Sequence, residues 1–514
     1  MSEFLREIKE AEVVEFGPMV SILVNQCRAR EKSNRLTALI WISEFITLGG
    51  TRLIQYYSGI LGSIMYCISD IETDIRQAAT TANTGLMALV RATTEPFELL
   101  PIIHTLTVEL LSEHVTTRVA SLHWIYMLHE KDSNEINKFI GDILPALLKT
   151  VSDNADEVVL INLQVLARIS LDEVQFNRVL NALIQLFYED RSLLETRGAL
   201  VIRKLCSLLD SSSIYLAMAR ILNSKNDLDY VSLMVQTLNL ILLTAPELAP
   251  LRKSLKQAFQ SNATEQDKTT FHQLFRCWTH NAVATFSLCL LAQAYHISAS
   301  LIQKFAEADV TVGFLMQIDK LVQLLESPIF IQLRLHLLET DSSLREDLLK
   351  SLYGLLMLLP QSQAYKTLSD RLATVSSLHM HIGLLNAHRQ YSNDVVPAPA
   401  GNNSQSGKNN NKAVLNRSPS KSKLALPNAD DLEGVNELVQ HFESIQTKHT
   451  DFRLSNLRAK SLLPQDNNST SNNNNTTNNN ATPAPPVASS EKKEVENNNP
   501  PSPTSPQAEG AAVN

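Results

Sequence analysis

Few residues in this sequence have the types and spacing that chemistry requires. Cys277 and His280 are separated by two residues, and Cys289 follows nearby. Thiolates and imidazoles bind zinc, but a structural zinc site needs four ligands, usually supplied as two close pairs. The sequence contains no second pair of this kind. A buried thiol and a histidine at a helix end explain Cys277 and His280 better, so neither a metal nor a cofactor is predicted.

Other catalytic patterns are missing or incomplete. Residues 401–408 read GNNSQSGK, but this spacing is one residue too long for a phosphate-binding loop, and no Ser or Thr follows Lys408. His379 and His381 are interpreted as part of a solvated helix end. The sequence lacks the patterns GxSxG, HExxH and GxGxxG. We therefore predict a protein without enzymatic activity.

The composition favours a helical protein. Hydrophobic residues make up 44% of the 514 residues, aromatic residues only 6%, and there are just 15 glycines. A net charge of −8 offers no basic footprint for nucleic acid. The odd number of scattered cysteines indicates a reducing compartment; they lie at positions 27, 67, 206, 277 and 289.

The sequence predicts neither a signal peptide nor a membrane span. The N-terminal residues MSEFLREIKEAEVVEF mix acidic with apolar side chains and lack the uninterrupted apolar core of a signal peptide. No run of about 20 apolar residues is present. We expect a cytoplasmic protein that reaches membranes through partners or a surface patch.

A helix pair recurs about every 40 residues in the first part of the chain. The pattern Arg-x-x-x-Leu-x-Trp-Ile occurs at 35–42 and again at 118–125, and Arg76, Val159 and Arg197 begin related segments. An apolar-periodic segment precedes each one: Pro18–Arg28, Ser58–Ser69, Leu100–Leu111, Phe139–Val151 and Phe176–Phe187. This spacing is typical of HEAT and armadillo repeats. We predict an all-α HEAT/armadillo-like solenoid over residues 1–208.

Beyond residue 208 the pattern stays helical, but the regular spacing fades after Phe271. We assign residues 209–388 to a C-terminal helical domain. Within it, residues 277–372 are mostly apolar or helix-forming and contain no ordered set of acids, bases or nucleophiles. Such a surface suits partner binding better than catalysis. The expected later helices are Thr269–Thr279, Val283–Tyr295, Ser298–Ala308, Val312–Glu326, Ile329–Leu338, Ser343–Leu359 and Ser362–Ser376.

The C-terminal part of the sequence is rich in Asn, Ser, Pro and Thr. We expect a disordered linker over 389–429 and a disordered tail over 461–514, because such compositions bury too little apolar surface to offset ordering entropy. Between them, apolar residues recur at steps of three and four, which predicts one amphipathic helix over 430–460. A lone helix is marginal in water, so it should dock on the solenoid or on a partner.

Two groups of charged residues leave alternatives open. Asp319 and Lys320 form either a solvated helix stripe or a charged pair at a helix–helix interface. Arg252, Lys253 and Lys256 either contact anionic lipid headgroups or serve solubility.

Long continuous strings carry a family resemblance. They are WTHNAVATFSLCLLAQAY from Trp278, FAEADVTVGFLMQIDKLVQLLESPIF from Phe305, LYGLLMLLPQSQAYKTLSDRL from Leu352, RLTALIWISEFITLGG from Arg35 and ELVQHFESIQTKH from Glu437. With them the chain resembles the vacuole-morphology scaffold family over residues 1 to about 388 and 430–460. In that family a HEAT-repeat protein holds the endosomal lipid kinase PIKfyve together with a Sac-domain phosphoinositide phosphatase.

The resemblance implies a non-enzymatic scaffold for synthesis and turnover of phosphatidylinositol 3,5-bisphosphate, peripheral on endosomal or vacuolar membranes. It further implies self-association and phosphatase binding by the C-terminal domain. Family members usually carry further repeats that contribute to kinase engagement, so the phosphatase is the more directly implied partner. We place the partner-binding surface within Trp278–Leu372, with six candidate residues: Trp278, Phe314, Asp319, Lys320, Leu321 and Leu325.

An adaptor or transport-receptor solenoid that binds peptide cargo is the alternative. Importin-like arrays line their concave face with Trp-x-x-x-Asn pairs. Here Phe45 lies four residues after Trp41, and Leu128 lies four residues after Trp124. The sequence therefore favours the lipid-enzyme scaffold.

Overall fold

The computed structural model describes residues 15–305, 311–339, 343–393 and 429–461. Every regular element within these ranges is a helix, and no strand occurs among them. Contacts between helices join the chain up to Arg458 into one compact unit. The all-α repeat architecture predicted from the sequence is confirmed.

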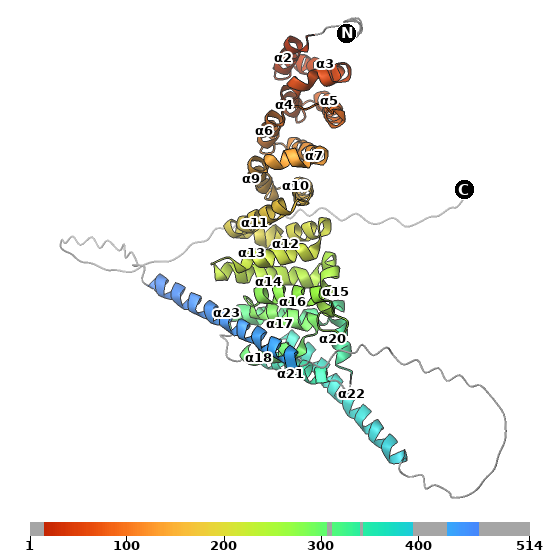
Figure 1. The fold of residues 1–514 in the computed structure, drawn as a ribbon, viewed down its shortest axis with the longest axis vertical. Helices are drawn as coiled ribbons and strands as arrows, with labels where there is room; N and C mark the ends of the chain where they lie inside the picture. The colour runs from red at the N-terminus through yellow and green to blue at the C-terminus, as the bar shows by residue number, and fades with distance from the viewer. Residues whose placement is uncertain (1–14, 306–310, 340–342, 394–428, 462–514) are drawn as a thin grey trace, which may run out of the picture. The chain divides into compact units, whose positions relative to one another are not determined.

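Paired helices build the first part of this unit and stack one pair upon the next (Figure 1). Each repeating Arg heads the second helix of a pair, as expected. Two short elements, Gly50–Tyr56 and Ser133–Lys138, were not predicted. The helices are α2 (Phe16–Gln26), α3 (Lys32–Gly49), η1 (Gly50–Tyr56), α4 (Tyr57–Cys67), α5 (Thr73–Ala92), α6 (Leu99–Glu109), α7 (Val115–Lys131), α8 (Ser133–Lys138), α9 (Ile140–Val151), α10 (Asp156–Ile169), α11 (Glu173–Glu189) and α12 (Arg191–Leu208).

The repeated arginines explain why neighbouring pairs hold together. The Arg118 guanidinium donates to the carbonyl oxygens of Ser112 and Glu113 in the loop before its own helix. It also forms an ion pair with Asp153 in the loop of the following pair, with 2.6 Å between Nε and Oδ2. Arg35 makes the same two kinds of contact and pairs with Asp70 at 2.7 Å. Each of these arginines therefore ties two successive repeats together.

The electrostatics of Asp70 show how closely it is matched to Arg35. Burial would raise the pKa of the Asp70 carboxyl group. Hydrogen bonds from Arg35 and from the Glu72 backbone N–H outweigh burial and hold this pKa below its usual value. The carboxylate therefore stays ionised and its link to Arg35 persists at neutral pH.

The chain continues without a break into the C-terminal helices. These are α13 (Ser211–Asn223), α14 (Leu228–Thr244), η2 (Pro246–Leu248), α15 (Ala249–Gln257), α16 (Glu265–Trp278), α17 (Ala282–Ala292), α18 (Tyr295–Phe305), α19 (Val312–Leu325), η3 (Pro328–Phe330), α20 (Ile331–His336), α21 (Ser343–Leu358), α22 (Gln363–Asn393) and α23 (Ala429–Ser461). Helix α22 runs through position 388, and contacts join both sides of position 208. The domain boundaries expected at these positions stay predictions.

Two of the expected helices differ from the observed ones. The helix expected over Val283–Tyr295 ends at Ala292, because Gln293 adopts a left-handed conformation with φ of 64° and terminates α17. The helix expected over Ser362–Ser376 extends to Asn393. The linker and tail expected to be disordered lie almost wholly outside the described residues.

Buried apolar side chains form one continuous core from α2 to α23. Helix α23 contributes Val435, Leu438 and Phe442 to it. No single described helix is long and apolar enough to cross a membrane, although α14 with the following segment Pro246–Gln257 passes the same test as a bent pair.

Candidate partner-binding surface on the C-terminal helices

A small cavity of about 70 Å³ lies between α14, α17 and α19. Asn239 on α14 lines it and accepts two hydrogen bonds at Oδ1, from Trp278 Nε1 at 3.1 Å and from Ser287 Oγ at 2.9 Å. An amide oxygen with both partners in place fixes neighbouring side chains in one arrangement. Asn239 thus links the core below the cavity to its wall.

The six candidate residues take different positions around this cavity. Lys320 and Leu321 line it, and Trp278 is fully buried behind Asn239. Leu325 is buried near the end of α19. Their role in binding a partner stays a prediction. As buried side chains, Trp278 and Leu325 can serve it by holding the surface in shape.

Asp319 and Lys320 turn toward different neighbours. Asp319 accepts a hydrogen bond from Ser362 Oγ at 2.9 Å and one from Gln323 Nε2 at 2.8 Å. It therefore connects α19 to the start of α22. Lys320 is exposed beside the small cavity. The structure places Asp319 at a helix–helix contact and leaves Lys320 accessible to a partner.

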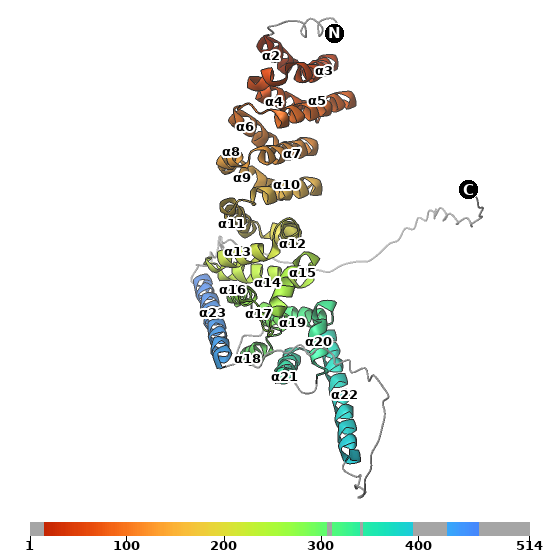
Figure 2. The same cartoon turned by 45° about the vertical axis from the view of Figure 1, so that its right-hand side comes forward.

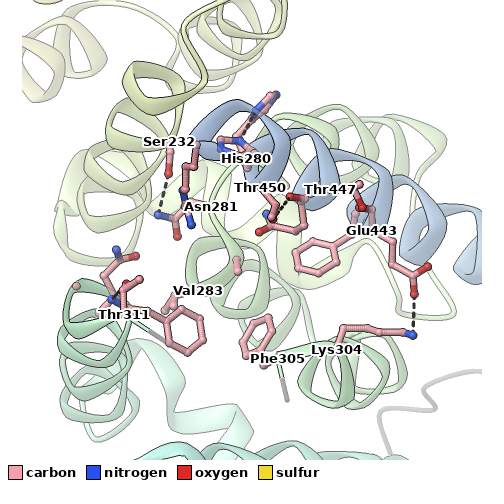
Figure 3. A pocket seen from close by; sticks show the side chains of 18 of the residues that line it. Ser232, His280, Asn281, Val283, Lys304, Phe305, Thr311, Glu443, Thr447 and Thr450 are labelled. Atoms are coloured by element: carbon pink, nitrogen blue, oxygen red, sulfur yellow. Dashed lines mark hydrogen bonds and ion pairs between the residues drawn. The ribbon is translucent and has the colours of Figure 1, made fainter. Parts of the chain in front are cut away.

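A larger cavity of about 570 Å³ lies between α23 and the helices α17 to α19. Phe314, the remaining candidate residue, lines it. Figure 3 shows side chains of α23 facing those of α17 and α18 across this space. Asn281 and Val283 line both cavities, so the two form adjoining parts of one surface.

Helix α23 is held on this surface by apolar and polar contacts together. Its buried residues include Phe442, whose ring lies 6.3 Å from that of Phe305 between centroids. Gln446 Nε2 donates to the Thr279 carbonyl oxygen at 2.6 Å. At the rim, Lys304 and Glu443 form an ion pair at 3.1 Å. The amphipathic pattern predicts such a helix, but its place on α16–α18 appears only in the structure (Figure 2).

A pair of histidines lies at the centre of this contact. His280 Nδ1 and His449 Nε2 are 3.1 Å apart, and both side chains are buried. His280 therefore faces α23 rather than a metal. Among the described residues no group of three or more His, Cys, Asp or Glu could hold a metal ion. Cys277 is a buried thiol, as expected from the sequence.

Burial is the main reason why both histidines stay neutral. It lowers the pKa of His280 to about 4, with further contributions from His449, His441 and Lys448. It lowers the pKa of His449 to about 4 as well, helped by the charge of Arg453. A neutral pair can share one N–H···N hydrogen bond, whereas a doubly protonated pair would bring two cations into contact.

Acidification should therefore release α23. Because both histidines bind protons more weakly when docked, docking is strongest above pH 6.5 and weakens as the pH falls toward 4, by up to about tenfold per pH unit for each histidine. Hydrogen exchange of the α23 amides, corrected for intrinsic rates, should rise at mildly acidic pH. The double substitution His280→Gln/His449→Gln should flatten this pH dependence, and equal protection of wild-type α23 at both pH values would contradict it.

Large apolar side chains are exposed on the last helices of the unit. Met357 on α21 is 85% exposed and Met380 on α22 is 70% exposed. The last turn of an array is normally polar on its outer side because nothing packs upon it. Exposed apolar residues there indicate a contact surface. Others on these helices are Val312, Met316, Ile331, Leu335, Leu338, Tyr353, Leu378 and Leu384.

Comparison with known proteins identifies the family. A family model for the C-terminal region of vacuolar protein 14, described by the binding of one partner protein, matches residues 191–375. A "Protein VAC14 homolog" from Arabidopsis thaliana is 44% identical over 384 residues, covering 74% of this chain and 51% of that protein. The chain belongs to the vacuolar protein 14 family. The resemblance noted in the sequence is thereby confirmed.

Two fungal members of the vacuolar protein 14 family also match. The homolog from Schizosaccharomyces pombe is 34% identical over 388 residues, covering 72% of this chain and 47% of that protein. "Vacuole morphology and inheritance protein 14" from Saccharomyces cerevisiae is 29% identical over 438 residues, covering 84% and 46%. The chain spans about half the length of the curated relatives it matches.

Solved structures add little to this identification. A designed armadillo repeat protein in complex with a (KR)4 peptide is 16% identical and covers 50% of this chain and 99% of its own, with a TM-score of 0.25. A score this low does not superpose the two folds. The repeat architecture of this vacuolar protein 14 relative therefore rests on its own helices.

Proposed function

We propose that this chain is a non-enzymatic scaffold that assembles a Sac-type phosphoinositide phosphatase with a phosphatidylinositol-3-phosphate 5-kinase. It would thereby regulate synthesis and turnover of phosphatidylinositol 3,5-bisphosphate on endosomal and vacuolar membranes. One observation carries the proposal: the match to a family model described by partner binding spans residues 191–375, which include the helices with exposed apolar side chains.

The mechanism is an increase in effective concentration. Two enzymes held on one platform meet each other and their shared lipid far more often than two free enzymes do. This role needs rigid surfaces and no catalytic group. A continuously packed helical unit provides such rigidity. Self-association would bring several kinases and phosphatases together and cover more of the apolar surface.

We assign phosphatase binding to the exposed apolar residues of α19 to α22. Met357 and Met380 protrude from this surface, so changing them removes contact area without opening the core. Methionine suits such a role because its flexible, polarisable side chain adapts to a partner. The small cavity beside Lys320 adjoins α19 and offers a polar edge to the same surface.

Charge on this surface should prevent phosphatase capture. We expect Met357→Asp/Met380→Asp in the full chain to retain at least about tenfold less of a purified Sac-type phosphatase, because a buried unpaired carboxylate is costly. Val174→Asp is the matched control: Val174 is 72% exposed on α11, outside the family match, and should bind normally.

The result distinguishes the proposal from its rival. Unchanged capture by the double variant would place phosphatase binding elsewhere. Failure of the folded wild-type chain to retain the phosphatase would refute the scaffold function and favour a peptide-binding adaptor. Adding the kinase as a second ligand tests whether this chain engages both enzymes.

A further inference from the structure

A basic cavity is formed by residues other than those around the histidine pair. It has a volume of about 510 Å³ and lies between α15 and the segment of η3 and α20. Three of its lining residues, Arg252, Lys253 and Lys256, are cations, and none of the lining residues carries a carboxylate. The remaining lining residues are Ala249, Gln257, Gln260, Pro328, Ile329 and Gln332.

Two of these cations are held in place by backbone oxygens. Lys256 Nζ donates to the Ile329 carbonyl oxygen at 2.9 Å. Arg252 Nη1 donates to the carbonyl oxygens of Leu242 and Ala245, at 2.8 and 2.6 Å. These bonds use some of the N–H groups and leave others, since a guanidinium has five and an ammonium three. The two positive charges are thus fixed at the cavity wall before any ligand arrives.

The positive charge of this cavity is not neutralised within the described part of the chain. No ion pair involves Arg252, Lys253 or Lys256 there. Glu247, the acidic group nearest Arg252 in sequence, pairs with Arg203 at 3.0 Å. Carbonyl dipoles orient cations without cancelling their charge. The cavity therefore presents a net positive potential to solvent.

The electrostatics confirm that the two inner cations are held at a cost. Burial lowers the pKa of the Lys256 ammonium, and the positive charge of Arg252 lowers it further. Burial likewise lowers the pKa of the Arg252 guanidinium. Surface solubility does not explain two half-buried cations side by side. An anion in the cavity would relieve both effects.

An amide adds a neutral donor to the same cavity. Gln332 Oε1 accepts a hydrogen bond from Gln293 Nε2 at 2.8 Å. With its oxygen engaged, Gln332 offers its amide nitrogen as a donor. The cavity thus combines guanidinium, ammonium and amide donors, which suits a ligand rich in acceptor oxygens.

We propose that this cavity binds a phosphate monoester group. Phosphate carries more charge and more acceptor oxygens than a carboxylate, and the cavity supplies three cations and an amide around one space. The phosphate can belong to a lipid headgroup or to a soluble compound. Exposed Lys253 admits the ligand and contacts it, while Arg252 and Lys256 hold its inner side.

The test uses the full chain and two sources of the same chemical group. Glycerol 3-phosphate is titrated by calorimetry, and phosphatidylcholine vesicles with and without phosphatidic acid are tested by co-sedimentation. Lys253→Glu should weaken binding at least about tenfold, because a repelling charge replaces an attracting one. Lys149→Glu is the matched control, since Lys149 is exposed on α9 and its substitution changes the net charge equally.

The outcomes separate the two sources. Binding of both ligands with loss in Lys253→Glu supports a general phosphate site. Binding of vesicles alone, with the same loss, supports a lipid headgroup site. No binding of either ligand, or equal weakening by Lys149→Glu, overturns the proposal. Lys256→Gln provides a second variant, used only if its thermal unfolding matches that of the wild type.

Discussion

Replacing Trp278 with alanine should lower the free energy of unfolding of the C-terminal helices by about 3–5 kcal/mol. Trp278 is fully buried, and its ring lies 6.2 Å from that of Tyr215 between centroids. Truncation leaves a cavity and also removes the indole N–H that binds Asn239. Chemical denaturation followed by circular dichroism measures the loss, and hydrogen exchange of α14 to α17 localises it.

A conservative variant separates packing from hydrogen bonding. Trp278→Phe retains a large ring and loses only the N–H donor, so we expect a smaller loss of about 1–3 kcal/mol. Because Asn239 also orders the wall of the small cavity, Trp278→Ala should weaken phosphatase capture as well. Wild-type unfolding of Trp278→Ala would show that this residue does not support the core.

Removing the carboxylate of Asp153 should be almost as damaging to the repeat array. Asp153 and Arg118 are 9% and 12% exposed, so Asp153→Ala leaves a guanidinium largely out of water without its counterion. Breaking a buried pair in this way costs about 3–5 kcal/mol. The substitution also removes the acceptor for the Ala155 backbone N–H at the start of α10. Thermal or chemical unfolding of the full chain measures the effect.

An exposed ion pair provides the matched comparison. Asp74 is 69% exposed and lies 3.8 Å from Lys32, so Asp74→Ala should change stability by about 0–1 kcal/mol. The double variant Arg118→Met/Asp153→Ala should recover part of the loss, since no unpaired charge remains buried. Equal effects of Asp153→Ala and Asp74→Ala would mean that the Arg118–Asp153 link does not hold the repeats together.

The repeats could be predicted because their signals are local. Apolar spacing marks each helix, and the recurring arginine marks where each second helix begins. What the arginine does could not be predicted, since its partner Asp153 lies in the next repeat. The break at Gln293 was missed because glutamine carries no signal for a left-handed conformation.

The contacts of α23 show a second limit of sequence reasoning. His280 invites comparison with the nearby Cys277, whereas its actual partner, His449, is 169 residues away. The basic residues of α15 similarly suggest a simple surface patch, but Lys256 binds a carbonyl oxygen 73 residues further on. Neither pairing leaves a local pattern, because both depend on how distant helices pack.

The position of α23 has a consequence for synthesis. The ribosome makes α16 to α18 well before it reaches residue 461, where α23 ends. At about 5–20 residues per second, the interval is on the order of ten seconds. During that time Phe305 and His280 lack the helix that later covers them. A nascent neighbour or a chaperone can occupy this face first, so partner choice would be decided partly by the order of translation.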